Sequence, residues 1–481
     1  MRSCHKKGYL TLYLSLCLTL ILSFVLTVLE GARRSTVRME GECAADIGMN
    51  SILAEYHREL LEQYDLLFVD MSYGTSMPEI ENTAQHLRAY IQKNAESTSM
   101  GMVSPRDWLG LSVDKARIME ISIASDAGGN VMKRQALEYM KSFSAEGILV
   151  ELLDKTAVMD TLGFDSRDIT AERSEIQSQI ERTELPLTED ENGQQIEMEL
   201  NNPADHVNRF RNSFLLGLIL GDTSPISGNV VRQEDYISQR AKITGNGLAP
   251  GYKEPGGAAD DLLFDCYLFD KCGWYGNERE KSLLKYQIEY IIAGKASDME
   301  NLEQVAKRLV GWREVANVVY LFSDAVKCGE AEALANSLTA VLLVPELAQP
   351  VKYAILFAWA YVESLTDVKC LLQGGRVPLI KTSADWRTDL DSVLDFSGEL
   401  SASGDGGNGM DYKDYLRVML FLEGNVRKNM RAMDLMEMDI RQTPGNSQFR
   451  MDACFESFLA EMSISSAFGY RLDLQKRYGY H

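Results

Sequence analysis

The feature that most constrains this chain is the stretch 9–29, where no side chain is charged over twenty-one positions. At about 1.5 Å per residue, a helix of this length crosses a hydrocarbon core about 30 Å thick. A secretory signal has a shorter apolar region, about 7–15 residues long, followed by small residues at a cleavage site. Here the stretch continues into Glu30-Gly31-Ala32-Arg33-Arg34. We therefore expect a retained transmembrane helix over 9–29; the alternatives are a cleaved signal and a buried helix of a soluble protein.

The orientation of this helix does not follow from the flanking charges. Three basic residues precede it and three follow it: Arg2, Lys6 and Lys7, then Arg33, Arg34 and Arg38. The excess of positive charge that marks a cytoplasmic flank is therefore missing on both sides. The free amino terminus favours a cytoplasmic segment 1–8, so we expect residues 31–481 to be extracytoplasmic at the cell membrane.

A second, amphipathic helix is expected over 30–64. The first proline of the chain is Pro78. Before it, apolar residues recur at helical spacing among charged ones: Ala44, Ile47, Ile52, Tyr56, Leu60 and Tyr64. This segment either continues the anchor as a stem that holds a head away from the membrane, or forms a separate short core helix.

The charge and the cysteines of the chain exclude some classes of protein. The 481 residues include 70 Asp and Glu against 49 Lys and Arg, for a net charge of −21. Proteins that bind phosphate backbones carry clustered basic residues, so we expect no nucleic-acid partner. Eight cysteines are too few for a disulfide scaffold. Cys266 and Cys272 are either buried thiols or a disulfide.

The remainder of the chain is expected to be α+β, because helical and strand patterns mix without a βαβ rhythm. The glycine- and proline-rich stretch 245–257 separates an α+β module, 65–250, from a helix-rich α+β module, 257–481. Residues 167–199 are strongly acidic and lack apolar periodicity. We expect an exposed, partly mobile excursion there.

Local patterns predict the individual elements. Strands are expected over 66–71, 115–124 (Met119, Ile121 and Ile123 inward), 376–381 and 460–468 (Met462 and Ile464 inward). Helices are expected over 78–92, 130–159, 350–372 and 412–440, with another from the capping-box sequence 297–300 to Phe322. The stretch AILFAWAYV within 350–372 is apolar on all sides but too short to span a bilayer, so it predicts a central core helix.

Three short motifs carry little chemistry. The sequence GDGGNG at 404–409 matches a dinucleotide-binding fingerprint, but no strand precedes it, so a flexible loop is expected. Positions in 188–199 partly match a calcium loop, in which the first ligand, here Thr188, should be acidic. Ser282 and Lys285 match S-x-x-K without its companion motifs.

No acid–base or metal site is indicated either. His57, His86 and His206 form no ligand or catalytic motif. Glu363 and Asp367 lie one helical turn apart on the apolar helix, where burial would raise their pKa values. The pair is either a catalytic dyad or a polar edge at the end of the helix, and we expect the polar edge. We therefore assign no catalytic, cofactor-binding or metal-binding residue and leave enzymatic activity open.

Three parts of the chain together carry a family resemblance that covers nearly its whole length. They are LTLYLSLCLTLILSFVLTVLEGARR with AEYHRELLEQYDLLFVD, YQIEYIIAGKASDMENL with ILFAWAYVESLTDVKCLLQGGRVPLIKT, and DYKDYLRVMLFL with RAMDLMEMDIR. They resemble an uncharacterised domain-of-unknown-function family of Gram-positive bacteria associated with Tad-type (Flp) pilus genes. The N-terminus resembles TadE/TadG pseudopilins, whose apolar helix ends in an acidic residue near a basic one, here Glu30 and Arg33. A prepilin peptidase would cut after Gly8, but Tyr13 replaces the expected glutamate, so we expect an uncut anchor.

The resemblance implies a non-catalytic, membrane-anchored structural or assembly component of a Tad-like pilus, similar to a minor pseudopilin. Its expected partners are membrane lipid and pilin or pilus-assembly proteins, with no cofactor. The alternatives are a membrane-tethered extracellular hydrolase that uses carboxylates, and a sensory or scaffold ectodomain.

Overall fold

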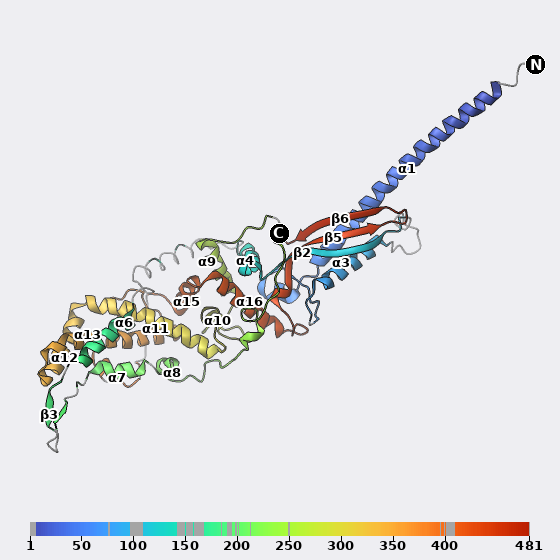
Figure 1. Ribbon diagram of the computed structural model, residues 1–481. Coiled ribbons are helices and arrows are strands. Elements are labelled where there is room, and N and C mark those ends of the chain that lie inside the picture. Colours follow the sequence, from blue (N-terminus) through green and yellow to red (C-terminus); the bar gives the residue numbers. More distant parts are fainter. Residues whose placement is uncertain are drawn as a thin grey trace, which may run out of the picture. The chain divides into compact units, whose positions relative to one another are not determined.

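The computed structural model shows a mixed α+β protein that begins with a long apolar helix, as expected (Figure 1). It describes residues 6–480 apart from 76, 97–108, 142–149, 151–156, 158–167, 184, 190–194, 198–199, 201, 212, 249–250, 395, 399 and 401–408. The chain forms two units. Unit 1 comprises 1–135, 241–255 and 440–481, and unit 2 comprises 136–240 and 256–439. The expected modules 65–250 and 257–481 are consecutive, whereas unit 1 is assembled from three separate stretches.

Unit 1 begins with helix α1, Lys6–Leu53, whose two halves differ. The apolar N-terminal half is exposed, whereas the second half buries one face through Val37, Ala45, Met49 and Ile52. A continuous helix to residue 64 was the wrong expectation, because α1 ends at Leu53 and a short helix α2, Arg58–Tyr64, follows. The break occurs where the chain joins the sheet: the His57 N–H donates to the Phe68 carbonyl at 2.8 Å.

The sheet of unit 1 is antiparallel and is centred on a strand from the C-terminal segment. This strand, β5 (Cys454–Ser465), pairs with β1 (Val69–Asp70), β2 (Ser112–Ile123) and β6 (Arg471–Gly479). Helices α1 and α3 (Ile80–Ala95) pack beside it (Figure 1).

The inward-facing residues of these strands were largely predicted. Met462 and Ile464 on β5, and Ile121 and Ile123 on β2, are buried as expected. Met119 was wrongly placed inward, because the pairing shifts between residues 118 and 120 and leaves Met119 40% exposed. Strand β6 was not expected.

Unit 2 is built around helix α13, Ala348–Leu372, which is buried along most of its length, as predicted for a core helix. The helices that contact it include α6 (Ile169–Arg182), α7 (Pro203–Phe210), α11 (Asp298–Ser323) and α12 (Ala325–Leu342). As predicted, α11 starts where the Ser297 hydroxyl accepts the Glu300 N–H at 3.2 Å. Further helices are α8 (Leu215–Leu220), α9 (Ala258–Lys271), α10 (Gln287–Ala293), α14 (Asp391–Leu394) and α15 (Tyr412–Phe421). Helices α4 (Asp126–Met140) and α16 (Asn425–Arg441) cross the boundaries between the units.

Several expectations in the 136–439 region need correction. No strand forms over 376–381, because Pro378 has no N–H to donate and Val377 makes only an isolated bridge to Met410. The helix expected over 412–440 is two helices, α15 and α16, separated at 422–424. The acidic stretch 167–199 contains α6 and a short hairpin of β3 (Leu187–Glu189) and β4 (Gln195–Glu197). Most of the helix predicted beyond Met140 lies outside the described residues.

Candidate functional site

The N-terminal half of α1 presents an uncovered apolar surface. The helix is long and apolar enough to cross a membrane, and none of its most apolar window is buried. Leu10, Leu20, Phe24 and Leu26 are 62–70% exposed. A contiguous apolar surface of this kind marks a contact with lipid or with another protein. We take it as the main part of the candidate functional site.

The second half of α1 is held tightly against the rest of unit 1. A Cβ atom at Gly41 would lie 2.6 Å from Leu472 Cδ2, and one at Gly48 would lie 2.6 Å from Ile91 Cγ1. Glycine at these two positions therefore lets α1 lie closer to Leu472 and Ile91 than a larger residue would allow. This half of the helix is part of a packed core and not a free stem.

One carboxylate fixes this half of α1 to strand β6. Asp46 accepts hydrogen bonds from the Lys476 ammonium and, at 2.8 Å, from the Tyr478 hydroxyl. Partial burial opposes ionisation of Asp46, but these two donors outweigh it and lower the pKa of its carboxyl group. The apolar half of the helix therefore projects from a firm base.

The boundary between the two halves of α1 is surrounded by a group that we call the collar: Glu30, Arg33, Arg34, Phe468 and Tyr470. Glu30 accepts a hydrogen bond from the Tyr470 hydroxyl and lies 3.6 Å from Arg34 Nε. The guanidinium carbons of Arg33 and Arg34 lie 4.9 and 5.2 Å from the ring centres of Phe468 and Tyr470, respectively. The two rings come from the turn between β5 and β6, which lies beside α1 (Figure 1). Glu30 and Arg33 were singled out in the sequence, but nothing local pointed to Phe468 and Tyr470.

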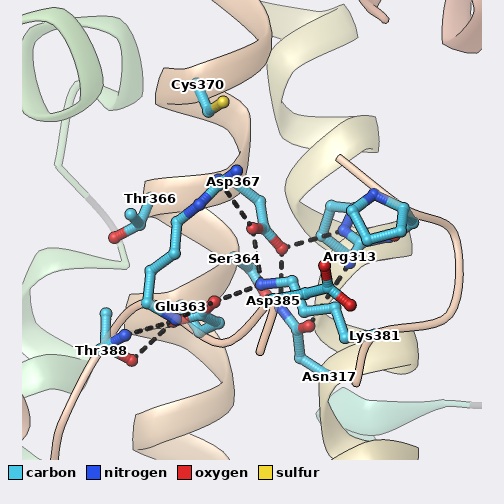
Figure 2. A network of polar contacts seen from close by, with 12 residues as sticks. Arg313, Asn317, Glu363, Ser364, Thr366, Asp367, Cys370, Lys381, Asp385 and Thr388 are labelled. Carbon is cyan, nitrogen blue, oxygen red and sulfur yellow. Dashed lines mark hydrogen bonds and ion pairs between the residues drawn. The ribbon is translucent and has the colours of Figure 1, made fainter. Parts of the chain in front are cut away.

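A different group, the ionic cluster, lies in the core of unit 2 and contains the candidate pair Glu363 and Asp367 (Figure 2). Lys381 contacts both carboxylates, with its Nζ 2.6 Å from Asp367 Oδ1. Arg313 Nε donates to Asp367 Oδ2 at 3.0 Å. These four side chains are at most 1% exposed. The expected polar edge at the end of the helix is therefore wrong, because both acids lie inside the core.

All four carboxylate oxygens of this pair have donors. Besides Lys381, the Arg387 backbone N–H reaches Glu363 Oε1 at 3.1 Å. The Thr388 hydroxyl reaches Glu363 Oε2 at 2.7 Å, and Asn317 reaches Asp367 Oδ2 at 3.2 Å. Burial alone would raise the pKa of Asp367, but Lys381 and Arg313 outweigh it and lower that pKa, contrary to expectation. The cluster thus resembles a satisfied structural network more than an acid–base dyad.

His57, His86 and His206 make separate structural contacts. His57 accepts the Leu60 N–H at the start of α2, and burial lowers its pKa. His86 Nδ1 lies 3.1 Å from Glu55 Oε1, and the rings of His206 and Phe210 stack 6.0 Å apart. Among the described residues, no three His, Cys, Asp or Glu side chains are grouped as metal ligands.

The remaining motifs also fail to form a site among the described residues. Lys285 Nζ donates to the carbonyls of Arg279 and Glu280 at 3.0 and 3.1 Å. The Ser282 hydroxyl contacts Asp439 at 3.3 Å. Residues 401–408, which carry most of the glycine motif, and residues 190–194 and 198–199, which carry most of the calcium-like loop, lie outside the described residues.

Cys266 and Cys272 are both free thiols. Cys272 is buried, and this burial raises its pKa to about 12. The structure therefore has free thiols at these two positions and not a disulfide between them.

Buried acids with raised pKa values were missed, among them Glu289 and Asp434. Burial raises the pKa of Glu289 to about 7, and its Oε1 accepts hydrogen bonds from the Tyr412 hydroxyl at 2.8 Å and the Tyr275 N–H at 2.9 Å. Burial likewise raises the pKa of Asp434 to about 6. Neither belongs to a motif, so no sequence signal separates them from the other acidic residues.

A polar groove of about 480 Å³ is lined by residues of α6 and α7 and by Arg211. Its charged residues are Arg173, Glu181, Asp205, Arg209 and Arg211. Burial, with a smaller contribution from Glu181, raises the pKa of the Asp205 carboxyl group. Arg211 is already paired with Glu314, with its Nη2 2.7 Å from Oε1.

A family of unknown function, DUF5702, matches residues 193–466, which is more than half of the chain. The matched region includes the ionic cluster and strand β5 but not α1. Neither the curated proteins nor the solved structures contain a match.

Proposed function

The chain belongs to DUF5702, a family of unknown function. From α1, we propose that the protein is a membrane-anchored, extracytoplasmic structural or assembly component of a Tad-like pilus, without catalytic activity. The observation that carries this proposal is the contrast within one helix, which is bare and apolar over its first half and packed against a sheet over its second.

This contrast fits a subunit that is held in lipid and can be transferred to an assembly. The bare half must be covered by hydrocarbon or by other apolar helices, because water solvates such a surface poorly. Helices associate in a membrane through close packing and need no catalytic group to do so. The packed half of α1 connects the helix firmly to the sheet, since Asp46 is hydrogen-bonded to Lys476 and Tyr478. The assignment to a Tad-like pilus rests on the resemblance of the N-terminus to pseudopilins.

Crosslinking of the full chain in native membranes tests the assembly role. Val25 lies on the bare half and is 46% exposed, so a cysteine there, with Cys17 and Cys43 changed to serine, should capture pilin or pilus-assembly proteins. The same substitution at Met49, which is fully buried, provides the control and should capture none. Recovery of lipid alone from the Val25 position would count against the proposal.

Protease treatment of intact cells tests the outward placement. The segment after residue 30 should be degraded, while a tag ahead of Tyr9 stays protected until the cells are lysed. Protection of residues 31–481 in intact cells would exclude an extracytoplasmic head.

The alternative of a membrane-tethered hydrolase draws on the groove of α6 and α7. Asp205, whose pKa is raised, and Glu181 both line it, and glycoside hydrolysis uses two carboxyl groups. If this alternative holds, wall polymers should be cleaved by the full chain and not by the D205N variant. An S178A variant, altered in the same groove without loss of a carboxyl group, should retain activity.

A further inference from the structure

Along α1, the collar lies at the level where the surface of a membrane is expected. Counted from Leu29, the last residue of the apolar stretch, Arg33 and Arg34 are about 6–8 Å further along the helix. If 9–29 fill the hydrocarbon core, this distance places both guanidinium groups among the lipid phosphates. This step rests on the membrane anchoring in the proposed function.

The side chains of the collar have the chemistry of an interfacial contact. Phe468 is 40% exposed at the tip of the β5–β6 turn, and the neighbouring Ala467 and Gly469 are exposed as well. Tyrosine concentrates at the level of the headgroups, phenylalanine lies at the boundary of the acyl chains in interfacial segments, and arginine binds phosphate oxygens in a bidentate manner. Glu30 accepts from the Tyr470 hydroxyl and pairs with Arg34, whereas Arg33 stacks on Phe468.

The collar is also rigidly connected to the fold. The β5–β6 turn is also bonded to the segment before β2, where the Ala467 N–H donates to the Leu109 carbonyl at 2.9 Å. The ring of Phe468 therefore cannot leave the level of Arg33 without movement of the hairpin. A contact at this point sets both how deep α1 sits and how the sheet of unit 1 is placed on the bilayer.

We propose that the collar is a phospholipid-headgroup site, in which Arg33 and Arg34 bind lipid phosphate and Phe468 lies at the hydrocarbon boundary. The ligand is the phosphodiester of a membrane phospholipid. The stem expected from the sequence would have held the head away from the membrane, whereas the collar places unit 1 directly on it.

Photocrosslinking of the full chain tests this site. The chain carries p-benzoylphenylalanine in place of Phe468 and is reconstituted into vesicles of phosphatidylcholine and phosphatidylglycerol. We expect a phospholipid adduct by mass spectrometry. The same probe in place of Gln475, an exposed residue further along β6, should give none. Equal yields at both positions, or no adduct at Phe468, would overturn the proposal.

The contribution of the two arginines is measured in the same vesicles. The R33Q/R34Q variant should lower the yield of adduct at Phe468 by at least about fivefold, because each basic residue near an anionic surface contributes about 1 kcal/mol. The R38Q variant, changed one turn further along α1 at a residue paired with Glu42, should keep the yield. An unchanged yield in R33Q/R34Q would exclude the arginines from the site.

Vesicle flotation in carbonate separates failure of the site from failure of the anchor. A chain that floats but gives no adduct at Phe468 retains its anchor and lacks the headgroup site. A chain that does not float refutes the anchoring as well.

Discussion

Arg313 and Asp367 form an ion pair in which neither side chain has any exposed surface, with Arg313 Nε 3.0 Å from Asp367 Oδ2. Removal of two charges from water is costly, and the mutual attraction repays this cost only when the remaining donors and acceptors are also satisfied. Here the Tyr415 hydroxyl and the carbonyls of Pro378 and Leu379 accept from Arg313 Nη1 at 3.0–3.2 Å. The pair therefore holds α11, α13 and the segment after Arg376 in one arrangement.

Loss of one member of this pair should destabilise unit 2 strongly. We expect R313M to lower the free energy of unfolding by about 3–5 kcal/mol, because Asp367 and its neighbours are left with unbalanced buried charge. The measurement is urea unfolding followed by fluorescence of Trp312 and Trp359, which are buried in unit 2. The K307Q variant, which breaks a half-exposed pair with Glu303 on α11, should cost less than about 1 kcal/mol. Similar losses in the two variants would contradict this view of the ionic cluster.

Glu289 should make unit 2 less stable as the pH rises. Its pKa is about 7 in the folded chain, raised from 4.5, so between these values the folded chain binds more protons than the unfolded chain. The free energy of unfolding should therefore fall from about pH 4.5 to 7, by about 3 kcal/mol for this group. E289Q should lack this fall when urea unfolding is repeated across that range. Parallel pH curves for E289Q and the unaltered chain would refute the assignment.

Asp367 should act in the opposite direction. Its pKa is lowered in the folded chain, so it stabilises the fold above its unfolded pKa, and this contribution disappears as the pH falls through the folded value. D367N should therefore be more harmful at pH 7 than below pH 3. A loss of stability that is independent of pH would argue that the charge of Asp367 is unimportant.

Gly48 should be far less tolerant of alanine than Gly31, although both lie inside α1. Alanine improves helix propensity equally at the two positions, but at Gly48 its Cβ would lie 2.6 Å from Ile91, whereas nothing lies within 4 Å at Gly31. We expect G48A to be less stable than G31A by about 1–3 kcal/mol. Hydrogen exchange of the β5 amides reports this difference. Equal exchange in the two variants would show that the close contact with α3 is readily relieved.

The thiols should react in the order of their exposure. Cys43 is exposed, whereas Cys272 and Cys454 are buried and burial raises the pKa of Cys272 to about 12. Of the cysteines that the structure describes, Cys43 should be labelled first by maleimide applied to the purified full chain at pH 7, because it is exposed and the thiolate is the reactive form. Cys272 should react only after denaturation, as read by mass spectrometry of the peptides. Labelling of Cys272 in the native chain would place it nearer to the surface.

The parts of the fold that could be predicted are those whose signal is local. Helix α13 follows from AILFAWAYV, and the inward face of β5 follows from the alternation of Met462 and Ile464. The break before α2 has neither proline nor glycine to mark it. It arises because Tyr56 pairs with Val69 and His57 bonds to Phe68.

Helix α6 and the collar escaped prediction for different reasons. In helix α6, only Ile169 is buried, so the mostly polar sequence of this helix shows no apolar periodicity. The collar joins Glu30 to Tyr470, which are 440 residues apart, and no local pattern encodes such a contact. Glu363 and Asp367 were recognised as a pair, but their donors Lys381 and Arg313 come from other segments and could not be assigned in advance.

The central position of β5 has a consequence for biosynthesis. Its first residue is Cys454, so β1 and β2, together with all of unit 2, are synthesised before the strand that joins them. Until then the nascent polypeptide has an apolar helix fit for insertion but exposes the unpaired edge of β2. A premature stop codon between residues 439 and 454 would therefore prevent the sheet of unit 1 from forming while every residue of unit 2 is present.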